Sequence, residues 1–230
     1  MENTKDWIGR IGFRYRTDIK RLAPEVYETI GQYSTCNLAD GSSRAYVMDR
    51  GIKPIGKPQR IVGPAITVEL PPGDNLMLHK AMGLAKPGDI LVVRTWGSQD
   101  FSVCGGLMMR RMQGLGIRGV IVDGCVRDRE DFASLEFPVF ARGTNPVGCR
   151  KEGPGQINFP MVCGGVVVMP GDTVAADEDG ILVLPEQDLQ EVLAGAGAKI
   201  AKEKKAMAEI HAGILIKPNI DRILQEKLGR

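Results

Sequence analysis

The strongest constraint on this chain is the way short apolar runs rich in β-branched residues alternate with segments of helical spacing. Buried strands are predicted at 60–70, 90–94 and 119–124, and helices at 77–85 and 103–115 between them. Parallel strands need such crossovers, because two of them cannot be joined by a tight hairpin. The alternation therefore predicts an α/β fold with helices packed on a sheet.

The last third of the chain has a different pattern. The segment 157–185 contains three strand-like runs that are separated by MPGD and DEDG turns, which predicts an antiparallel meander. Further helices are predicted at 23–33, 34–45, 127–135 and 186–212, with a last short helix starting at Pro218, and a further strand is predicted at 137–143. No linker is evident, so we expect a surface arm at 1–22 and a single domain with a mixed sheet at 23–230.

Composition excludes several classes of function. The 230 residues are 43% hydrophobic and 25% charged, which is typical of a globular protein. Lys and Arg number 30 against 28 Asp and Glu, and aromatic residues make up only 5%, so we expect no nucleic-acid partner and no membrane partner. Five cysteines without a CxxC pair favour a reducing, cytoplasmic location over a disulfide framework or a zinc cluster.

Three familiar motifs are incomplete. The GLGIRG segment at 114–119 fits GxGxxG but follows a predicted helix, which is the reverse of the dinucleotide-binding order. The GIKPIGKP segment at 51–58 has Pro58 where a phosphate loop needs a hydroxyl residue. Only His79 and His211 could serve a nucleophile–histidine hydrolase, so we do not expect that chemistry.

The segment 103–132 carries the best candidate site. The strand ending at Asp123 leads through a short turn to Arg127 and Asp128, at the start of a predicted helix. Ligands bind beyond the carboxyl ends of strands in α/β sheets, and helix starts attract anions. Arg suits a carboxylate, and Asp suits Mg²⁺ or Mn²⁺. The plainer alternative is that Asp128 caps its own helix and Arg127 is a surface charge.

Several longer motifs resemble one family. They are RIVGPAITV (60–68), PGDNLMLHKA (72–81), KPGDILVV (86–93), the Gly-Gly pair at 105, GVIVDGCVRD (119–128) and GGVVVMPGDTVAADEDGILVLP (164–185). Over roughly residues 25–212 the chain resembles the family of the regulator of ribonuclease activity A, RraA. That family includes the class II aldolases for 4-hydroxy-4-methyl-2-oxoglutarate and 4-carboxy-4-hydroxy-2-oxoadipate. The resemblance implies an α/β/β/α sandwich similar to the phosphohistidine swivelling domain, assembled as a homotrimer or as a hexamer of two trimers.

The resemblance also implies roles for individual residues. A small 2-oxo acid substrate would bind by its pyruvate part, through backbone groups, to Gly105, Gly106, Leu107 and Met108. Arg127 would contact substrate oxygens, and Asp128 would hold a divalent metal, Mg²⁺ or Mn²⁺. The aldolase branch is favoured because the regulator branch often lacks that Asp.

One position departs from the aldolase pattern. Many aldolases carry an acid twenty-one residues before the Arg, where this chain has Gly106, although Asp131 matches the acid that often follows the Arg-Asp pair. A further acid is expected from a neighbouring subunit's C-terminal helix, and Glu203 is the nearest match, with Glu209 second.

These features together predict a metal-dependent carbon–carbon lyase. It would cleave 4-hydroxy-4-methyl-2-oxoglutarate-type acids to pyruvate and would also be expected to decarboxylate oxaloacetate, since both reactions leave the same enolate. The alternative is a non-enzymatic regulator that binds a ribonuclease-type protein. A quinone methyltransferase, a label that this family sometimes carries, is disfavoured because no nucleotide-binding glycine loop joins a first strand to its helix.

Overall fold

A four-stranded parallel sheet forms the centre of the protein. The computed structural model describes residues 6–57, 59–132, 134–217 and 219–229. The central strands lie in the order β4 (Ile61–Glu69), β5 (Ile90–Arg94), β6 (Gly119–Val126) and β7 (Val139–Thr144). Each strand is parallel to its neighbour, so their carboxyl ends meet at one edge. The strands predicted from the sequence at 60–70, 90–94, 119–124 and 137–143 are confirmed.

Helices cover one face of this sheet. Helix α3 (Leu76–Met82) connects β4 to β5, and α4 (Gly106–Gly114) connects β5 to β6. Leu91 and Val93 point toward this layer, where they pack in one cluster with Met109 and Met112. Their neighbours Ile90 and Val92 point to the opposite face and are equally buried. Burial on both faces explains why these strands are continuous apolar runs.

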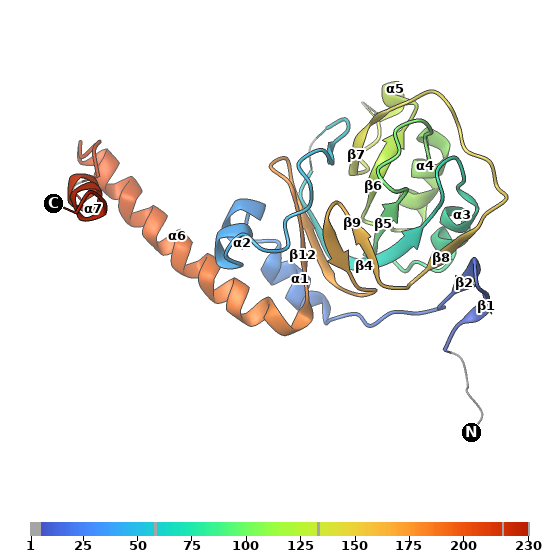
Figure 1. The fold of residues 1–230 in the computed structure, drawn as a ribbon, viewed down its shortest axis with the longest axis horizontal. Coiled ribbons are helices and arrows are strands. Elements are labelled where there is room, and N and C mark those ends of the chain that lie inside the picture. The colour runs from blue at the N-terminus through green and yellow to red at the C-terminus, as the bar shows by residue number, and fades with distance from the viewer. Residues whose placement is uncertain (1–5, 58, 133, 218, 230) are drawn as a thin grey trace.

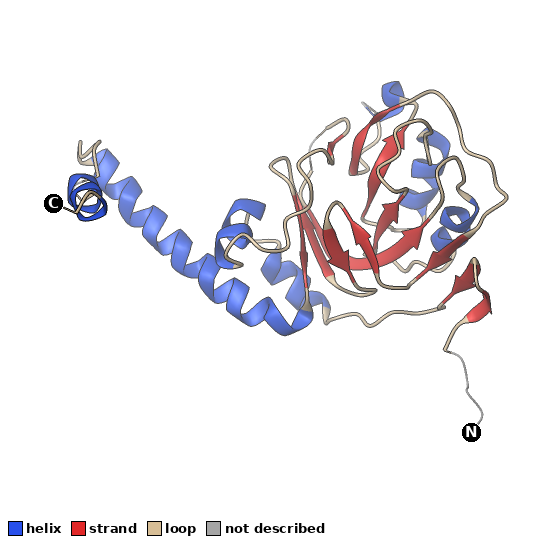
Figure 2. Cartoon of the chain, in the orientation of Figure 1, coloured by secondary structure: helices blue, strands red, loops and turns tan. Residues whose placement is uncertain are grey.

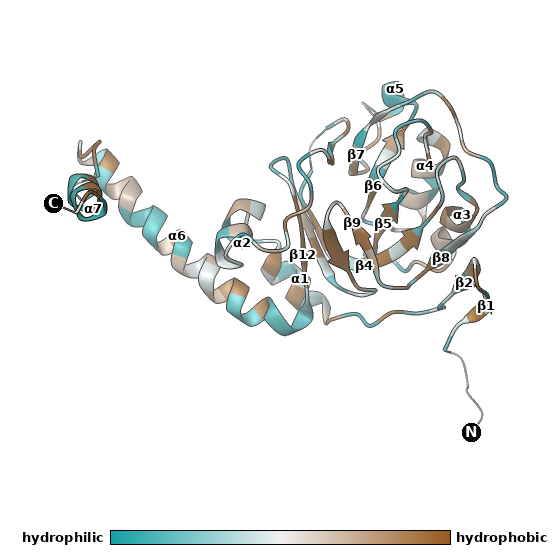
Figure 3. Ribbon diagram, viewed as in Figure 1, coloured by the Kyte–Doolittle hydropathy of each residue, from teal (hydrophilic) through white to brown (hydrophobic). Residues whose placement is uncertain are grey.

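A second β layer covers the other face. It is formed by β9 (Met161–Cys163), β10 (Val166–Val168), β11 (Thr173–Ala176) and β12 (Ile181–Leu184). Strand β11 pairs with both β12 and β4, which joins the two β layers at one edge. Figure 3 shows the apolar character of the strands on both sides of this interface.

A second helical layer completes the sandwich. It consists of α1 (Pro24–Ile30), α2 (Thr35–Gly41) and the first half of α6 (Leu189–His211), which pack on Leu182 and Leu184. Figure 2 shows strands between helices on the two outer sides. The predicted α/β/β/α sandwich is thereby confirmed as a single domain. The second half of α6 and α7 (Ile220–Lys227) project away from it (Figure 1).

The N-terminal segment joins the sheet edge. Strands β1 (Ile8–Arg10) and β2 (Phe13–Tyr15) form a hairpin, and β2 pairs with β8 (Gly155–Ile157), which in turn pairs with β4. At the opposite edge, β3 (Lys53–Pro54) pairs with β7. The predicted arm at 1–22 therefore contains ordered strands, while a boundary at residue 22 stays a prediction.

Two local predictions need correction. The predicted three-stranded meander is instead two hairpins, β9–β10 and β11–β12, because Gly164 and Gly165 both adopt positive φ and form a tight turn.

Several predicted helices are shorter in the structure: α2 ends at Gly41, α4 begins at Gly106, and α5 comprises Arg129–Phe132. The 186–212 helix begins as a 3₁₀ turn, η1 (Glu186–Asp188). The predicted helix start at Pro218 lies outside the described residues.

Within the described residues, no helix is both long enough and apolar enough to cross a bilayer. All five cysteines are free thiols.

Candidate functional site

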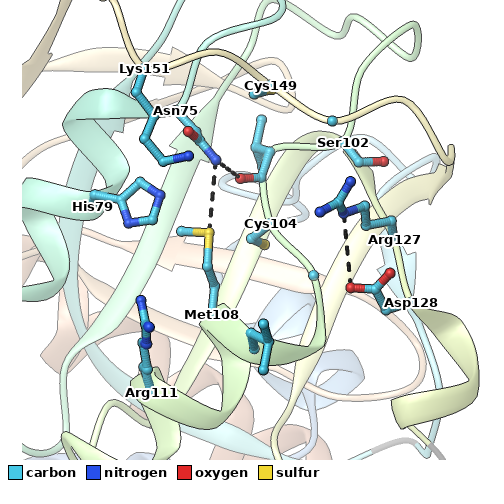
Figure 4. A pocket seen from close by; sticks show the side chains of 14 residues that line it. Asn75, His79, Ser102, Cys104, Met108, Arg111, Arg127, Asp128, Cys149 and Lys151 are labelled. Atoms are coloured by element: carbon cyan, nitrogen blue, oxygen red, sulfur yellow. Dashed lines mark hydrogen bonds and ion pairs between the residues drawn. The ribbon is translucent and has the colours of Figure 1, made fainter.

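A pocket of about 310 Å³ lies where β6 ends and α4 begins (Figure 4). Its lining includes Gly105, Leu107, Met108, Arg127 and Asp128, which are five of the predicted site residues. Gly106, another of them, donates its backbone N–H to Asp128. The structure thus brings together two segments that are separated by the whole of α4 and β6. This is the edge at which α/β folds bind ligands.

Asp128 is held in an uncommon backbone conformation. Its φ is +66°, a left-handed value that few residues other than glycine adopt. Its Oδ2 accepts the 3.0 Å hydrogen bond from the backbone N–H of Gly106, at the start of α4. The carboxylate therefore caps α4, which corrects the alternative that Asp128 caps the helix following it. A strained residue in a pocket is a typical mark of a functional site.

Arg127 lies beside this carboxylate. Its backbone N–H donates to the Cys104 carbonyl at 3.0 Å, and its Nε lies 3.9 Å from Asp128 Oδ2. The guanidinium passes close to Gly148, where a β-carbon would lie only 2.8 Å from Nη1. About half of the Arg127 side chain is exposed, which leaves its remaining N–H groups available to a ligand.

The first turn of α4 lies against Arg127 and Asp128 and lines the pocket beside them. Gly105 has no room for a side chain, because a β-carbon there would overlap Asp128 Oδ2 and lie 2.9 Å from Arg127 Cγ. The first intrahelical hydrogen bond runs from Met109 N–H to the Gly105 carbonyl. The N–H groups of Leu107 and Met108 precede it, so they have no partner within the helix and suit an anionic ligand.

A second carboxylate lies close to the first. A β-carbon on Gly106 would overlap Asp131 Oδ2, so Asp131 occupies the space into which a side chain at 106 would project. Asp131 Oδ1 lies 3.5 Å from Arg110 Nη2. The chain thus places an acid beside the start of α4 although position 106 itself is a glycine.

The donor set near Asp128 fits a hydrated metal ion. Among the described residues, no three His, Cys, Asp or Glu side chains cluster as a complete metal cage. Mg²⁺ does not need one, because it is usually bound by one or two carboxylates and keeps several waters. Both protein contacts of Asp128 fall on Oδ2, which leaves Oδ1 as a candidate ligand. Asp131 is near enough to Gly106 to accept hydrogen bonds from such waters.

The two cysteines of the pocket do not compete for this role. Burial raises the pKa of Cys104 to about 12 and that of Cys149 to about 11. Both thiols are therefore protonated at neutral pH, which makes them poor nucleophiles. Mg²⁺ and Mn²⁺ prefer carboxylate oxygens to sulfur, so the oxygen ligands suit these metals better.

The opposite side of the pocket was not predicted from the sequence. It is formed by Asn75, His79, Arg111 and Lys151, which we call the distal wall. Asn75 and His79 belong to the PGDNLMLHKA segment at 72–81, so the motif itself was the available signal. Arg111 and Lys151 had no comparable signal, because single basic residues are common on protein surfaces.

The predicted glutamates lie elsewhere. Glu203 sits on α6, where its carboxylate lies 3.7 Å from Lys199 Nζ and accepts a 3.3 Å hydrogen bond from Asn37 Nδ2. Figure 1 places α6 on the opposite side of the domain from α4. Glu203 and Glu209 therefore do not join the pocket of their own chain, and a contribution to a neighbour's pocket stays a prediction.

Comparison with known proteins finds a family model that matches most of the chain. Residues 35–183 match the family model RraA-like, described as Aldolase/RraA. A Halalkalibacterium halodurans protein named "Putative 4-hydroxy-4-methyl-2-oxoglutarate aldolase" is 40% identical over 171 residues, which are 74% of this chain and 81% of that protein.

Solved structures show the same fold. An uncharacterized protein from Pseudomonas syringae pv. tomato superimposes with a TM-score of 0.76 at 26% identity, covering 85% of this chain and 92% of that one. The RNA-processing inhibitor RraA from Thermus thermophilis superimposes with a TM-score of 0.62 at 33% identity, covering 66% of this chain and 93% of that one.

Proposed function

The chain belongs to the RraA-like family, and we propose that it is a divalent-metal-dependent aldolase. It would cleave 2-oxo acids of the 4-hydroxy-4-methyl-2-oxoglutarate type to pyruvate, and it would decarboxylate oxaloacetate at the same site. The aldolase name of the H. halodurans relative supports the reaction class.

One observation carries this proposal. Arg127, Asp128 and the first turn of α4 share one pocket, so a cation, a carboxylate and unpaired N–H groups converge on the same small volume. A 2-oxo carboxylate has two adjacent polar groups that match these donors.

Asp128 and Asp131 would hold the metal, Asp128 directly and Asp131 through water. When bound, Mg²⁺ or Mn²⁺ acts as a Lewis acid that polarises the 2-keto group and stabilises negative charge developing on it. The hydrogen bond from the Gly106 N–H would fix the Asp128 carboxylate in position for this role, since it holds one of the two carboxylate oxygens.

The protein groups orient the substrate for bond cleavage. Arg127 and the first-turn N–H groups of α4 would bind the C1 carboxylate and the 2-keto oxygen. In the aldol cleavage the C3–C4 bond breaks, its electron pair passes to C3, and the 4-hydroxyl loses its proton to a water molecule as C4 becomes a carbonyl. C3 of the resulting enolate then takes a proton from water, which gives pyruvate. Arg127 would stabilise the charge that this leaves on the pyruvate fragment. Loss of CO₂ from oxaloacetate leaves the same fragment.

The active unit would be a homotrimer or a hexamer in which a neighbour supplies Glu203 or Glu209. The projecting half of α6 and α7 support this arrangement, because they leave apolar side chains exposed on a segment remote from the domain (Figure 1). These side chains include Ile200, Met207, Ile210, Ile220, Ile223 and Leu224. An apolar surface of this kind is typical of an interface.

The test is a measurement of pyruvate release. Purified protein with Mg²⁺ or Mn²⁺ should release pyruvate from oxaloacetate and from 4-hydroxy-4-methyl-2-oxoglutarate, detected by reduction to lactate. A chelator should abolish the release, and added metal should restore it. Turnover of neither substrate, with either metal and with a folded oligomeric protein, would contradict the proposal.

A further inference from the structure

The strand that leads to the candidate site contains a β-bulge shortly before Arg127. Strand β6 has two residues, Asp123 and Gly124, where β7 has only Arg142. The flanking pairs are Val122 with Ala141 and Cys125 with Gly143. Bulges are rare in parallel pairs and are over-represented next to active sites, where they change the course of a strand. The way this bulge is held therefore bears on where Arg127 lies.

We propose that Asp123 and Arg142 are positioning residues for the reaction, because together they hold this bulge. They would keep the segment that carries Arg127 and Asp128 in register with the start of α4. The inference rests on the proposed function, which places the substrate and the metal at those two residues.

An ion pair spans the bulge. Arg142 is the residue opposite it, and Arg142 Nε donates to Asp123 Oδ1. Arg142 Nη1 donates to Asp49 Oδ2 at 2.9 Å, and the Gly164 N–H donates to Asp123 Oδ2 at 3.3 Å. The side chains of Arg142 and Asp123 are only 18% and 10% exposed. Charge-assisted hydrogen bonds with so little solvent contact are screened weakly, so the pair ties β6 firmly to β7 at this point.

The loop after β5 closes over the bulge from the other side. Thr95 Oγ1 donates to the Asp123 carbonyl at 2.9 Å, at the point where the pairing of β6 with β7 is interrupted. Gly124 has no room for a side chain, because a β-carbon there would overlap Thr95 Oγ1 and lie 3.0 Å from the Ser98 carbonyl oxygen. The bulge is thus enclosed between the loop and β7.

Beyond the bulge, β6 changes its neighbour. Asp123 is its last residue paired with β5. Cys125 then pairs with Ser102, in the segment that leads to α4. The hydrogen bonds that follow are Val103 N–H to the Cys125 carbonyl at 3.0 Å, Arg127 N–H to the Cys104 carbonyl at 3.0 Å, and Gly106 N–H to Asp128 Oδ2 at 3.0 Å. One residue of a strand spans about 3.3 Å, so a slip by one residue would break all three.

The pair lies outside the pocket lining, so its effect would reach the reaction through the backbone. Asp123 and Arg142 would act on Arg127 and Asp128 by fixing where those residues stand against the first turn of α4. Misplacing reacting groups by about 1 Å can lower a rate by a factor of about a hundred. Loss of the pair should therefore slow the reaction although no group in the pocket has been changed.

The test uses Arg142→Met, which keeps a long side chain but removes its donors. Amide hydrogen exchange, resolved to single residues, is measured at Val103 and Arg127, whose N–H groups report the register directly. We expect exchange at both to quicken about tenfold or more. At saturating Mn²⁺, kcat for oxaloacetate should fall roughly tenfold to a hundredfold. The dissociation constant for Mn²⁺, measured by calorimetry without substrate, should rise about tenfold.

Two further variants guard against a trivial loss of folding. Arg142→Lys keeps one charged donor, so it should restore part of the exchange protection and part of kcat. Arg142→Met leaves the Asp123 carboxylate without its partner, which is costly for a group with little exposure. The double variant Asp123→Asn with Arg142→Met removes that charge and should fold, yet it should still exchange rapidly and react slowly.

Glu69→Gln is the matched control. Arg94 Nη1 lies 2.7 Å from Glu69 Oε1, and these side chains are 21% and 18% exposed, so the pair resembles that of Arg142 and Asp123. It joins β4 to β5 and lies outside the bulge. Glu69→Gln should leave kcat and the exchange at Val103 and Arg127 within about twofold of wild type.

The outcomes separate this inference from the proposed function. Wild-type exchange at Val103 and Arg127 in the double variant, or exchange that quickens equally in Glu69→Gln, would overturn the positioning role. Full activity in a double variant whose two amides exchange faster would overturn it as well. A wild-type protein that releases no pyruvate would contradict the proposed function, and the exchange rates and the Mn²⁺ affinity would still decide whether the pair positions Asp128.

Discussion

Asp131 fills the space that a side chain on Gly106 would need, since a β-carbon on the glycine would overlap Oδ2 of the aspartate. An acid at position 106 would therefore require the Asp131 side chain to shift from its present position. The two residues are held together by the start of α4 and the short helix α5, whose first residues follow Asp128 directly. A carboxylate on α5 thus lies beside the start of α4, at a point where position 106 itself has no side chain.

This relationship predicts that an acid can be moved from one helix to the other. Asp131→Ala should weaken Mn²⁺ binding by roughly tenfold to a hundredfold, the scale for groups that support a metal site from outside its direct ligands. Gly106→Asp alone should lower the melting temperature because of the overlap. The double variant should regain most of the metal affinity, as measured by calorimetry. A double variant no better than Asp131→Ala would show that Asp131 does not serve the metal.

Asp128 is predicted to be the direct metal ligand. Asp128→Ala should abolish metal-dependent pyruvate release, because several kcal/mol of Lewis-acid stabilisation depend on this anchor. The loss of the α4 cap should cost about 1 kcal/mol of stability, so the protein should remain folded.

Asp128→Asn is the matched variant. Its amide oxygen can still accept from the Gly106 N–H, and Asn tolerates the left-handed backbone, but the negative charge is gone. Circular dichroism should show native stability together with low activity. Full activity in either variant would contradict the mechanism.

Arg127 should not tolerate replacement by lysine. Lys is a point charge and cannot form the planar, bidentate contact with a carboxylate. Arg127→Lys should therefore lower kcat/KM for oxaloacetate by roughly tenfold to a thousandfold. Arg129→Lys, at the exposed start of α5, is the control and should behave as wild type. A change below about twofold in Arg127→Lys would place this guanidinium outside the site.

The sequence predicted the central sheet well, because strands buried on both faces are continuous apolar runs such as ILVVR at 90–94. It also predicted that Arg127, Asp128 and the Gly105 turn would meet, since both segments follow parallel strands. It did not predict the Gly164-Gly165 turn, because two glycines within an apolar run leave the hydrophobic pattern almost unchanged. It missed the distal wall for a different reason: Lys151 lies beside α3 because its neighbours hydrogen-bond to Gly73, Asp74 and Asn75, and no local pattern encodes these contacts.

The N-terminal arm is predicted to depend on one buried ion pair. Asp89 is fully buried and accepts from Arg21 Nε and Nη2 at 2.8 and 2.7 Å, so the pair ties the arm to the domain. Arg21→Met should lower the free energy of unfolding by roughly 3–5 kcal/mol, because it leaves a buried charge without its partner. Urea titration measures this free energy of unfolding. Lys86→Met, which removes an exposed pair with Asp18, should cost less than about 1 kcal/mol.

Acid should destabilise the same region only at low pH. The hydrogen bond from Arg21 holds the pKa of Asp18 at about 2, below its ordinary value of 3.8. A carboxyl with a lowered pKa stabilises the fold fully above the unfolded value, and this contribution is lost as the pH falls toward the folded value. The contribution of Asp18 should therefore disappear between about pH 4 and pH 2, and Asp18→Asn should remove that part of the pH dependence.

The active site is predicted to be shared between subunits. Within one chain the pocket has Asp128 as its one acidic lining residue, while Glu203 lies on α6 on the opposite side of the domain. Waters around a bound Mg²⁺ need hydrogen-bond acceptors, and a neighbour's helix can supply one. Asp128→Ala and Glu203→Ala should each be inactive alone. When the two are mixed, dissociated and reassembled, random assortment should give about a quarter of the interfaces both intact groups, with matching recovery of activity.

The matched control mixes Asp128→Ala with Arg127→Ala. These two residues are adjacent in one chain and line the same pocket, so random reassembly creates no complete site from them. Activity recovered only in the Glu203 mixture would assign that glutamate to the neighbouring pocket, and repeating the experiment with Glu209→Ala tests the second candidate. No recovery from mutants shown by native mass spectrometry to co-assemble would contradict the shared site, because Glu203 would then have no role in a neighbour's pocket.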